Sequence, residues 1–175
     1  MLDAPVVGPL WLAWVPEGLT MLRFGADPPA ERARARFWPE ADGSLPEGDI
    51  PDPVYDTLRR YFGGDAVDPA TLPVRLGGTR FQRRTWAALR RVPRGRVRTY
   101  AGLAKDVGSP RAMRAIGVAM GANPIAVVVP CHRVVGTRHT LGGYSGGLER
   151  KRALLELEGV VVDGDQVLPG QLELL

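Results

Sequence analysis

The feature that most constrains the fold is the division of residues 79–122 into three short helical patterns by proline and glycine. Thr79 and the glutamine three residues later have the spacing of a capping box, which predicts a helix that starts there and ends near the "VPRG" segment. A second helix is expected to start near Tyr100, and a third to be capped by Ser109 with Pro110 in its first turn. The "GSP" corner between these two helices predicts a helix-turn-helix.

The third helix has an unusual composition on one side. Its alanines form a ridge that would let a backbone approach a narrow groove, and Arg114 stands between this ridge and the apolar stripe. The ridge consists of Ala112, Ala115, Ala119 and Ala122. Alanine is also the best helix former, so the default interpretation of the ridge alone is helix propensity. By helical phase Met113 falls on the apolar stripe and is expected to pack in the core.

The first half of the chain predicts a strand-rich unit. Two apolar segments, residues 10–15 and 19–24, are joined by "PEG" and predict a β-hairpin. Helices are expected over residues 28–38 and 54–62, the second of them ended by a pair of glycines. Residues 68–78 are expected to link the two halves.

Charge divides the chain at the same place. Residues 1–75 carry 7 Arg against 12 Asp and Glu, a net charge of −5, whereas residues 76–175 carry 14 Arg and 2 Lys against 7 acids, a net charge of +9. Genome composition would explain the preference for Arg over Lys, but it does not explain this segregation. The charges therefore favour a second half that binds a polyanion.

The cysteine and histidine content limits the kinds of site that the chain can form. One cysteine among 175 residues excludes an internal disulfide, and with only two histidines it is too little for a closed structural zinc site. The N-terminal segment has neither the basic region of a signal peptide nor an apolar run of about 18 residues. We therefore expect a cytoplasmic protein without a metal.

The single cysteine lies in the stretch "IAVVVPCHRVVG". The β-branched run over residues 125–129 predicts a buried strand, and Pro130 would end its ladder, so that Cys131 leaves the sheet at a fixed edge. A lone cysteine is usually an inert buried hydrophobe. Here its neighbours favour a nucleophile that is offered to a pocket.

An acid–base partner is available for this thiol. A free thiol has a pKa of about 8.5, so it needs a base or a positive potential to react at neutral pH. His132 can serve as the base, and Glu158 is the carboxylate that can support it, since helical phase directs the rival Glu156 elsewhere. Adjacent side chains of a strand point to opposite faces, so either the chain turns at Cys131 or a water relays the proton.

Residues 78–159 resemble, without a gap, the O6-alkylguanine-DNA alkyltransferases, also called methylated-DNA-protein-cysteine methyltransferases. The resemblance is carried by "PCHRVVG", by "GANPIAVVV" before it, by "GGYSGGLERKRALLELEG" after it, and by "FQRRTWAALRRVPRGRVRTYAGLAKDVGSPRAMRAIGVAM". It implies an α+β fold: a small α/β, ribonuclease-H-like N-terminal domain over residues 1–75, and a mostly helical, winged-helix-like DNA-binding alkyltransferase domain over residues 76–175. The first half resembles the family only loosely, through "GPLWLAW" and the order of its elements.

The resemblance implies catalytic roles for five residues. Cys131 accepts the alkyl group, and His132, a bridging water and Glu158 form the relay that deprotonates it. Asn123 braces the turns around the site through its side-chain amide. Tyr100 pushes the phosphate of the target nucleotide and supplies a hydroxyl near the guanine ring as the leaving group gains charge.

The resemblance also implies which residues contact DNA and the flipped base. Arg114 is the arginine finger that takes the place of the flipped nucleotide, on a helix whose other contact residues are Ala112, Met113, Ala115 and Gly117. Ser145 contacts the alkylated oxygen, Tyr144 packs along the pocket, and backbone carbonyls near Cys131 and Val134 accept from the guanine amino group. Met113 and Val118 depart from the family, which often has alanine and glycine there.

The implied activity is direct reversal of DNA damage. The thiolate displaces guanine from the alkyl carbon, and the thioether that forms is not readily reversed, so each molecule acts once, as a monomer and without a cofactor. The partner is double-stranded DNA that contains O6-alkylguanine. The sequence leaves open the repair of O4-alkylthymine, the range of alkyl groups and cooperative assembly along DNA.

Three other functions are compatible with parts of the sequence. A non-catalytic protein that binds alkylated DNA would keep the pocket, but such proteins typically lack the cysteine. A helix-turn-helix regulator would use Cys131 only as a structural residue. A cysteine hydrolase would need an oxyanion hole and repeated turnover.

Overall fold

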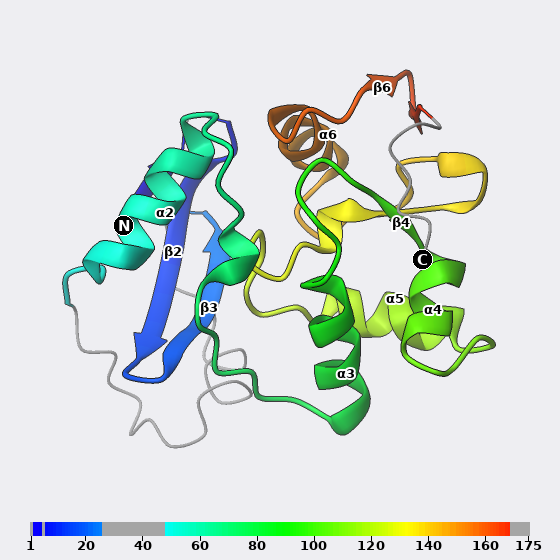
Figure 1. The fold of residues 1–175 in the computed structure, drawn as a ribbon, viewed down its shortest axis with the longest axis horizontal. Coiled ribbons are helices and arrows are strands. Elements are labelled where there is room, and N and C mark those ends of the chain that lie inside the picture. Colours follow the sequence, from blue (N-terminus) through cyan, green and yellow to red (C-terminus); the bar gives the residue numbers. More distant parts are fainter. Residues whose placement is uncertain (1, 5, 26–47, 169–175) are drawn as a thin grey trace.

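The computed structural model describes residues 2–4, 6–25 and 48–168. These residues form a mixed α/β protein, in which a three-stranded sheet and one helix lie beside a group of four helices (Figure 1). The strands are β1 (Leu2–Ala4), β2 (Gly8–Val15), β3 (Gly18–Phe24), β4 (Arg98–Thr99), β5 (Val134–Val135), β6 (Val162–Asp163) and β7 (Gln166–Val167). The α-helices are α2 (Asp52–Phe62), α3 (Arg80–Leu89), α4 (Tyr100–Asp106), α5 (Met113–Gly121) and α6 (Leu148–Leu157). Short 3₁₀ helices are η1 (Pro69–Thr71), η2 (Cys131–Arg133) and η3 (Thr137–His139).

The expected β-hairpin is confirmed. Strand β2 pairs with β3 on one side and β1 on the other, all antiparallel. Apolar side chains on this sheet, such as Leu10 and Leu19, pack in one cluster with Leu58 and Tyr61 of helix α2. The helix expected over residues 54–62 is confirmed as α2, which begins two residues earlier and is followed by the glycine pair. The helix expected over residues 28–38 lies outside the described residues.

The segment that links the two halves is bound to the sheet. The backbone of Leu19 donates to the Pro73 carbonyl at 2.9 Å and accepts from the Arg75 amide at 2.8 Å. Gly18 lets these segments meet: its φ is +139°, and a Cβ there would lie 2.5 Å from the Pro73 carbonyl carbon. The link between the halves is therefore held to β3 by backbone hydrogen bonds.

The first two helices of the second half occur where the sequence predicts them. Both halves of the capping box form at the start of α3, and Trp86 on this helix is fully buried. The indole of Trp86 donates to the Ala119 carbonyl at 2.9 Å, which joins α3 to α5. Helix α4 begins at Tyr100, and the Thr99 side chain caps it by accepting from the Gly102 amide.

The third helix begins later than expected. The Ala112 amide donates to the Ser109 carbonyl in a turn, and helix α5 starts at Met113 without a side-chain cap. The cap at Ser109 and the first helical turn at Pro110 were therefore wrong predictions. The backbone carbonyl of Ser109 takes part in this turn, and the first helical bond runs from Ile116 to Ala112.

The side chains of α5 also differ from expectation. Met113 is 48% exposed rather than packed in the core: it is the first residue of α5, and the buried side of this helix begins at Ile116. The alanines do not form one exposed ridge, since Ala119 is 1% exposed and packs on the same side as Ile116. The exposed residues of α5 are Met113, Arg114, Ala115, Val118 and Gly121.

The buried strand expected over residues 125–129 is absent, and a series of tight turns replaces it. Ile125 makes a single bridge to Leu22 of β3, and the Val129 amide then turns back to the Ile125 carbonyl at 2.8 Å. Val127 has a φ of +70°, a left-handed conformation that a β-branched residue rarely adopts and that costs about 1–3 kcal/mol. The surrounding core offsets this strain, since Val127 is fully buried.

Candidate active site

The single thiol is placed by the turns that follow α5. The side-chain amide of Asn123 donates to the Val129 carbonyl at 2.7 Å and to Sγ of Cys131 at 3.1 Å. The Asn123 side-chain oxygen accepts from the Ile125 amide at 3.0 Å, so one residue fixes both ends of the turn. Backbone bonds between Leu22 of β3 and residues on either side of Ile125 attach this turn to the N-terminal sheet.

The thiol of Cys131 is not ionised on its own at neutral pH. Cys131 is 3% exposed, and this burial raises the pKa of its thiol. The hydrogen bond from Asn123 and the positive charge of Lys151 act in the opposite direction and offset only part of the effect. A base is therefore needed to remove the proton when the sulfur reacts.

Cys131 lines a small cavity of about 210 Å³. The other residues of its lining are Tyr100, Gly117, Met120, Gly121, Gly143, Tyr144 and Ser145. A larger hollow of about 630 Å³ lies between α6 and residues 140–142, but its lining includes no cysteine, histidine or tyrosine. The smaller cavity is the candidate site because it holds the only thiol.

Both tyrosines of this lining keep their protons. Burial raises the pKa of Tyr100, and the charge of Cys131 adds to this effect. Burial and then the charge of Cys131 raise the pKa of Tyr144 still further above its ordinary value. The site therefore offers neutral hydroxyl groups, which can donate hydrogen bonds to an oxygen that gains negative charge.

His132, the residue that follows Cys131, forms a buried pair with a carboxylate. His132 Nε2 is 3.0 Å from Glu158 Oε1, and both side chains are fully buried. Cys131 and His132 lie on the 3₁₀ turn η2 rather than on a strand, so the chain turns at this point. Glu156, the rival carboxylate, is exposed and pairs with Arg152.

The hydrogen bonds of His132 fix its tautomer. Glu158 can only accept, so Nε2 carries the proton, and Nδ1 is left with a free lone pair. Nδ1 is buried and has no hydrogen-bond partner among the described residues. Burial lowers the pKa of His132, although Glu158 opposes this, and the ring is neutral at neutral pH. The pair can therefore accept one proton at Nδ1.

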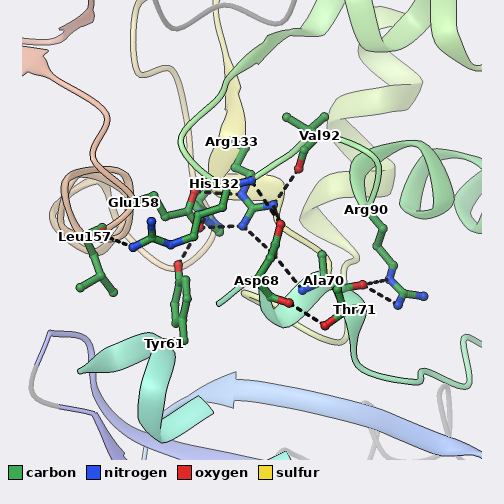
Figure 2. Close-up of polar contacts among 11 residues, drawn as sticks. Tyr61, Asp68, Ala70, Thr71, Arg90, Val92, His132, Arg133, Leu157 and Glu158 are labelled. Carbon is green, nitrogen blue, oxygen red and sulfur yellow. Dashed lines mark hydrogen bonds and ion pairs between the residues drawn. The ribbon is translucent and has the colours of Figure 1, made fainter. Parts of the chain in front are cut away.

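Hydrogen-bond donors stabilise the negative charge of Glu158. Burial alone would raise its pKa, but His132 and Arg133 outweigh that effect and hold the pKa well below its usual range. Arg133 donates from Nε to Oε2 at 2.9 Å and from Nη2 to Oε1 at 2.8 Å, a bidentate pair. Figure 2 shows these residues together with Tyr61 and Asp68, which come from the first half of the chain.

Sequence reasoning missed four residues of this site. Arg133 follows the predicted cysteine and histidine directly, and Lys151 lies two helical turns before Glu158 on the same side of α6, so both had a detectable signal. Lys151 is fully buried, donates to the Val134 and Leu141 carbonyls, and has its pKa lowered by burial to about 8. Tyr61 and Asp68 had no signal, because only the tertiary fold brings them here.

The structure gathers most predicted site residues but not all of them. Tyr100, Tyr144, Ser145 and Gly117 line the cavity with Cys131. The Val134 carbonyl already accepts from the Lys151 ammonium, and Val134 is not part of the lining. Arg114, Met113 and Ala115 are exposed on α5, while Ala112 and Gly117 are half-buried. Among the described residues no group of His, Cys, Asp and Glu could hold a metal.

Comparison with known proteins identifies the family of this chain. A family model described as "6-O-methylguanine DNA methyltransferase, DNA binding domain" matches residues 80–160. A Mycobacterium tuberculosis protein named methylated-DNA--protein-cysteine methyltransferase is 43% identical over 157 residues, which cover 90% of this chain and 89% of the relative. The chain belongs to this methyltransferase family. The resemblance in the second half is thereby confirmed.

Other members of the methylated-DNA--protein-cysteine methyltransferase family are also similar to this chain in sequence and in structure. The Shigella flexneri protein of this name is 49% identical over 112 residues, which cover 64% of this chain and 66% of the relative. The crystal structure of Mycobacterium tuberculosis OGT in complex with DNA has a TM-score of 0.75 and 40% identity, over 90% of this chain and 89% of that one. The likeness therefore extends through the sheet as well as the helices. None of the helices in the described part of the chain has the length and apolar character to span a bilayer.

Proposed function

We propose that this protein repairs DNA by transferring the alkyl group of O6-alkylguanine to Sγ of Cys131. The observation that carries the proposal is the position of the only thiol in the lining of a cavity, beside a buried histidine–glutamate pair. Relatives that are 43% and 49% identical to this chain over 157 and 112 residues are named methylated-DNA--protein-cysteine methyltransferases. The thiol is a stoichiometric acceptor and needs no cofactor, because the lesion carries its own leaving group.

The reaction is a displacement in line at the alkyl carbon. The thiol proton passes through a bridging water to Nδ1 of His132, and Glu158 stabilises the imidazolium that forms. The sulfur lone pair forms the S–C bond while the C–O6 bond breaks and its electrons go to the guanine oxygen. The Tyr100 hydroxyl, kept protonated by burial, donates toward the guanine ring, and Ser145 contacts the oxygen. Tyr144 packs along the base.

The second half of the chain binds the DNA. The lesion oxygen lies inside the duplex, so the base must be flipped into the pocket at a cost of a few kcal/mol. Helix α5 enters the minor groove as the second helix of a helix-turn-helix with α4, and its exposed Arg114 takes the place of the extruded base. Ala112, Met113, Ala115 and Gly117 contact the groove, and the net charge of +9 over residues 76–175 attracts the phosphates.

The remaining assignments concern the domains and the compartment. Residues 1–75 correspond to a ribonuclease-H-like N-terminal domain, and residues 76–175 to the winged-helix-like alkyltransferase domain. The partner is double-stranded DNA with O6-alkylguanine, bound by a monomer. One unpaired thiol that must stay reduced suits the cytoplasm.

The proposal is tested by mass spectrometry of the protein after incubation with a duplex that contains O6-methylguanine. A gain of one methyl group on the Cys131 peptide is expected, and the same duplex with ordinary guanine serves as the control. A protein that binds the modified duplex but stays unmodified would be a binding module, and the proposal would be wrong.

Arg114→Ala is expected to slow methyl transfer from duplex DNA by about 10- to 100-fold, because the flipped state loses about 1.5–3 kcal/mol of support. Reaction with the free modified base, which needs no flipping, should be almost unchanged. Both rates are measured by the methylated fraction of Cys131 with time. Arg59→Ala removes the same charge from the exposed side of α2 and is the matched control. Equal losses with duplex and free base would contradict a flipping role.

A further inference from the structure

Glu158 connects the proposed relay to the first half of the chain. Its Oε1 atom accepts from His132 Nε2 at 3.0 Å, from Arg133 Nη2 at 2.8 Å and from the Tyr61 hydroxyl at 2.7 Å. Tyr61 lies 97 residues earlier in the sequence, in the last turn of α2, and is fully buried. Figure 2 shows the Tyr61 ring reaching up from α2 to this carboxylate.

The Tyr61 hydroxyl can act only as a donor in this position. Burial, and then the negative charge of Glu158, raise the pKa of Tyr61 well above its ordinary value, so the hydroxyl keeps its proton. The ring is held by an edge-to-face contact with Phe62, with centroids 5.1 Å apart. The hydroxyl of Tyr61, in the first half of the chain, therefore donates to Oε1 of Glu158, in the second half.

Arg133 alone does not settle where Oε1 points. Its fork engages both carboxylate oxygens of Glu158, while its other contacts are with Asp68 and the Val92 carbonyl. The Tyr61 hydroxyl adds a donor to Oε1, the oxygen that faces His132, and supports the geometry in which this oxygen receives Nε2–H.

We infer that Tyr61 is a positioning residue for alkyl transfer, whose hydroxyl holds Oε1 of Glu158 against His132. The inference rests on the proposed function and assigns the first half of the chain a part in the chemistry. Outer partners of a catalytic or ligating histidine typically change activity by about 10- to 100-fold when removed. The Tyr61 hydroxyl contacts Glu158 and not His132 itself, so we expect an effect at the lower end of that range.

The test is Tyr61→Phe, which deletes one oxygen and keeps the ring. Methyl transfer from O6-methylguanine duplex is expected to slow by about 10-fold at neutral pH. The acid limb of the pH–rate profile should also move to lower pH, because an Oε1 that is no longer held against His132 stabilises the imidazolium of His132 less. The charged and titratable groups around the pair are Tyr61, Asp68, Arg94, Arg133, Tyr144, Lys151 and Cys131, and all but Tyr61 are unchanged in this variant.

Two controls separate positioning from general stability. Tyr55→Phe removes a hydroxyl from the same helix at a position that is 45% exposed, and should match the wild type. Leu58→Val opens a small space in the buried side of α2 without touching Glu158, and should lower stability while leaving the rate per folded molecule and the pH profile unchanged. Folded fractions are taken from denaturant curves of each variant.

A double variant shows whether Tyr61 acts through Glu158. In a Glu158→Gln background, Tyr61→Phe should slow transfer by less than about twofold, because the carboxylate that it positions is already gone. A Tyr61→Phe protein whose rate and pH profile match the wild type, or match Leu58→Val, would overturn the inference. If the wild type itself transferred no methyl group, the proposed function would be wrong instead, so the two failures are distinguishable.

Discussion

Cys131→Ala is expected to abolish methyl transfer completely while the protein still binds DNA that contains O6-methylguanine. Cys131 is the only cysteine in the chain, so no other thiol can replace it. The groups that shape the cavity, Tyr100, Tyr144 and Ser145, remain in place in this variant. Loss of one small buried sulfur should lower the free energy of unfolding by only about 1 kcal/mol.

The measurement combines two readouts on the same samples. A labelled methyl group in the duplex reports transfer to protein, and a fluorescent duplex reports binding. The wild type and the variant should bind alike before any reaction, and only the wild type should carry the label afterwards. Label on the alanine protein would mean that another residue is the acceptor. Loss of binding in the alanine protein, together with loss of transfer, would mean that the thiol supports the pocket itself.

The helices of the second half were predictable because their signals are local. The capping box at Thr79 and the apolar spacing after Tyr100 depend on neighbours within one or two turns, and both helices begin where the sequence places them. The choice of Glu158 rather than Glu156 as the partner of His132 was predictable for the same reason, since helical phase decides which of the two faces the core. Local physical rules were sufficient for these elements.

The turn that carries the thiol was not predictable from local rules. A run of β-branched residues is typical of a buried strand, and residues 125–129 are indeed buried for the most part. Their backbone is nevertheless determined by Asn123, whose amide reaches across the turn to Val129 and Cys131, and by the edge of β3. These contacts favour turns over a ladder, including the left-handed Val127.

The contacts between the halves were equally invisible in the sequence. Asp68 lies in what composition indicates to be a linker, yet it accepts from both terminal nitrogens of the buried Arg133. Tyr61 is one aromatic residue on the apolar side of a short helix, and nothing in its surroundings distinguishes it from Phe62. A hydroxyl that finds a partner 97 residues away can be recognised only in three dimensions.

Glu158→Gln is expected to have the largest effect on stability, a loss of about 3–5 kcal/mol at pH 7, because it leaves the buried Arg133 with only Asp68 as a counter-charge. Methyl transfer should fall by about 100-fold as well, since a neutral amide stabilises the imidazolium of His132 poorly. Glu156→Gln, on the exposed side of the same helix, is the matched control and should change stability by less than about 0.5 kcal/mol.

The pH dependence of this difference identifies its origin. The pKa of Glu158 in the folded protein lies well below the value of about 4.3 in an unfolded chain, so the carboxylate stabilises the fold fully above that pH. This contribution is lost as the pH falls from there toward the folded pKa, because the carboxyl of the unfolded chain takes up a proton in this range while the native carboxylate stays charged. The stability gap between wild type and Glu158→Gln, measured by denaturant unfolding, should therefore be constant near neutral pH and narrow in acid. A gap that stayed constant down to acid pH would mean that packing, and not the buried charge, makes Glu158 important.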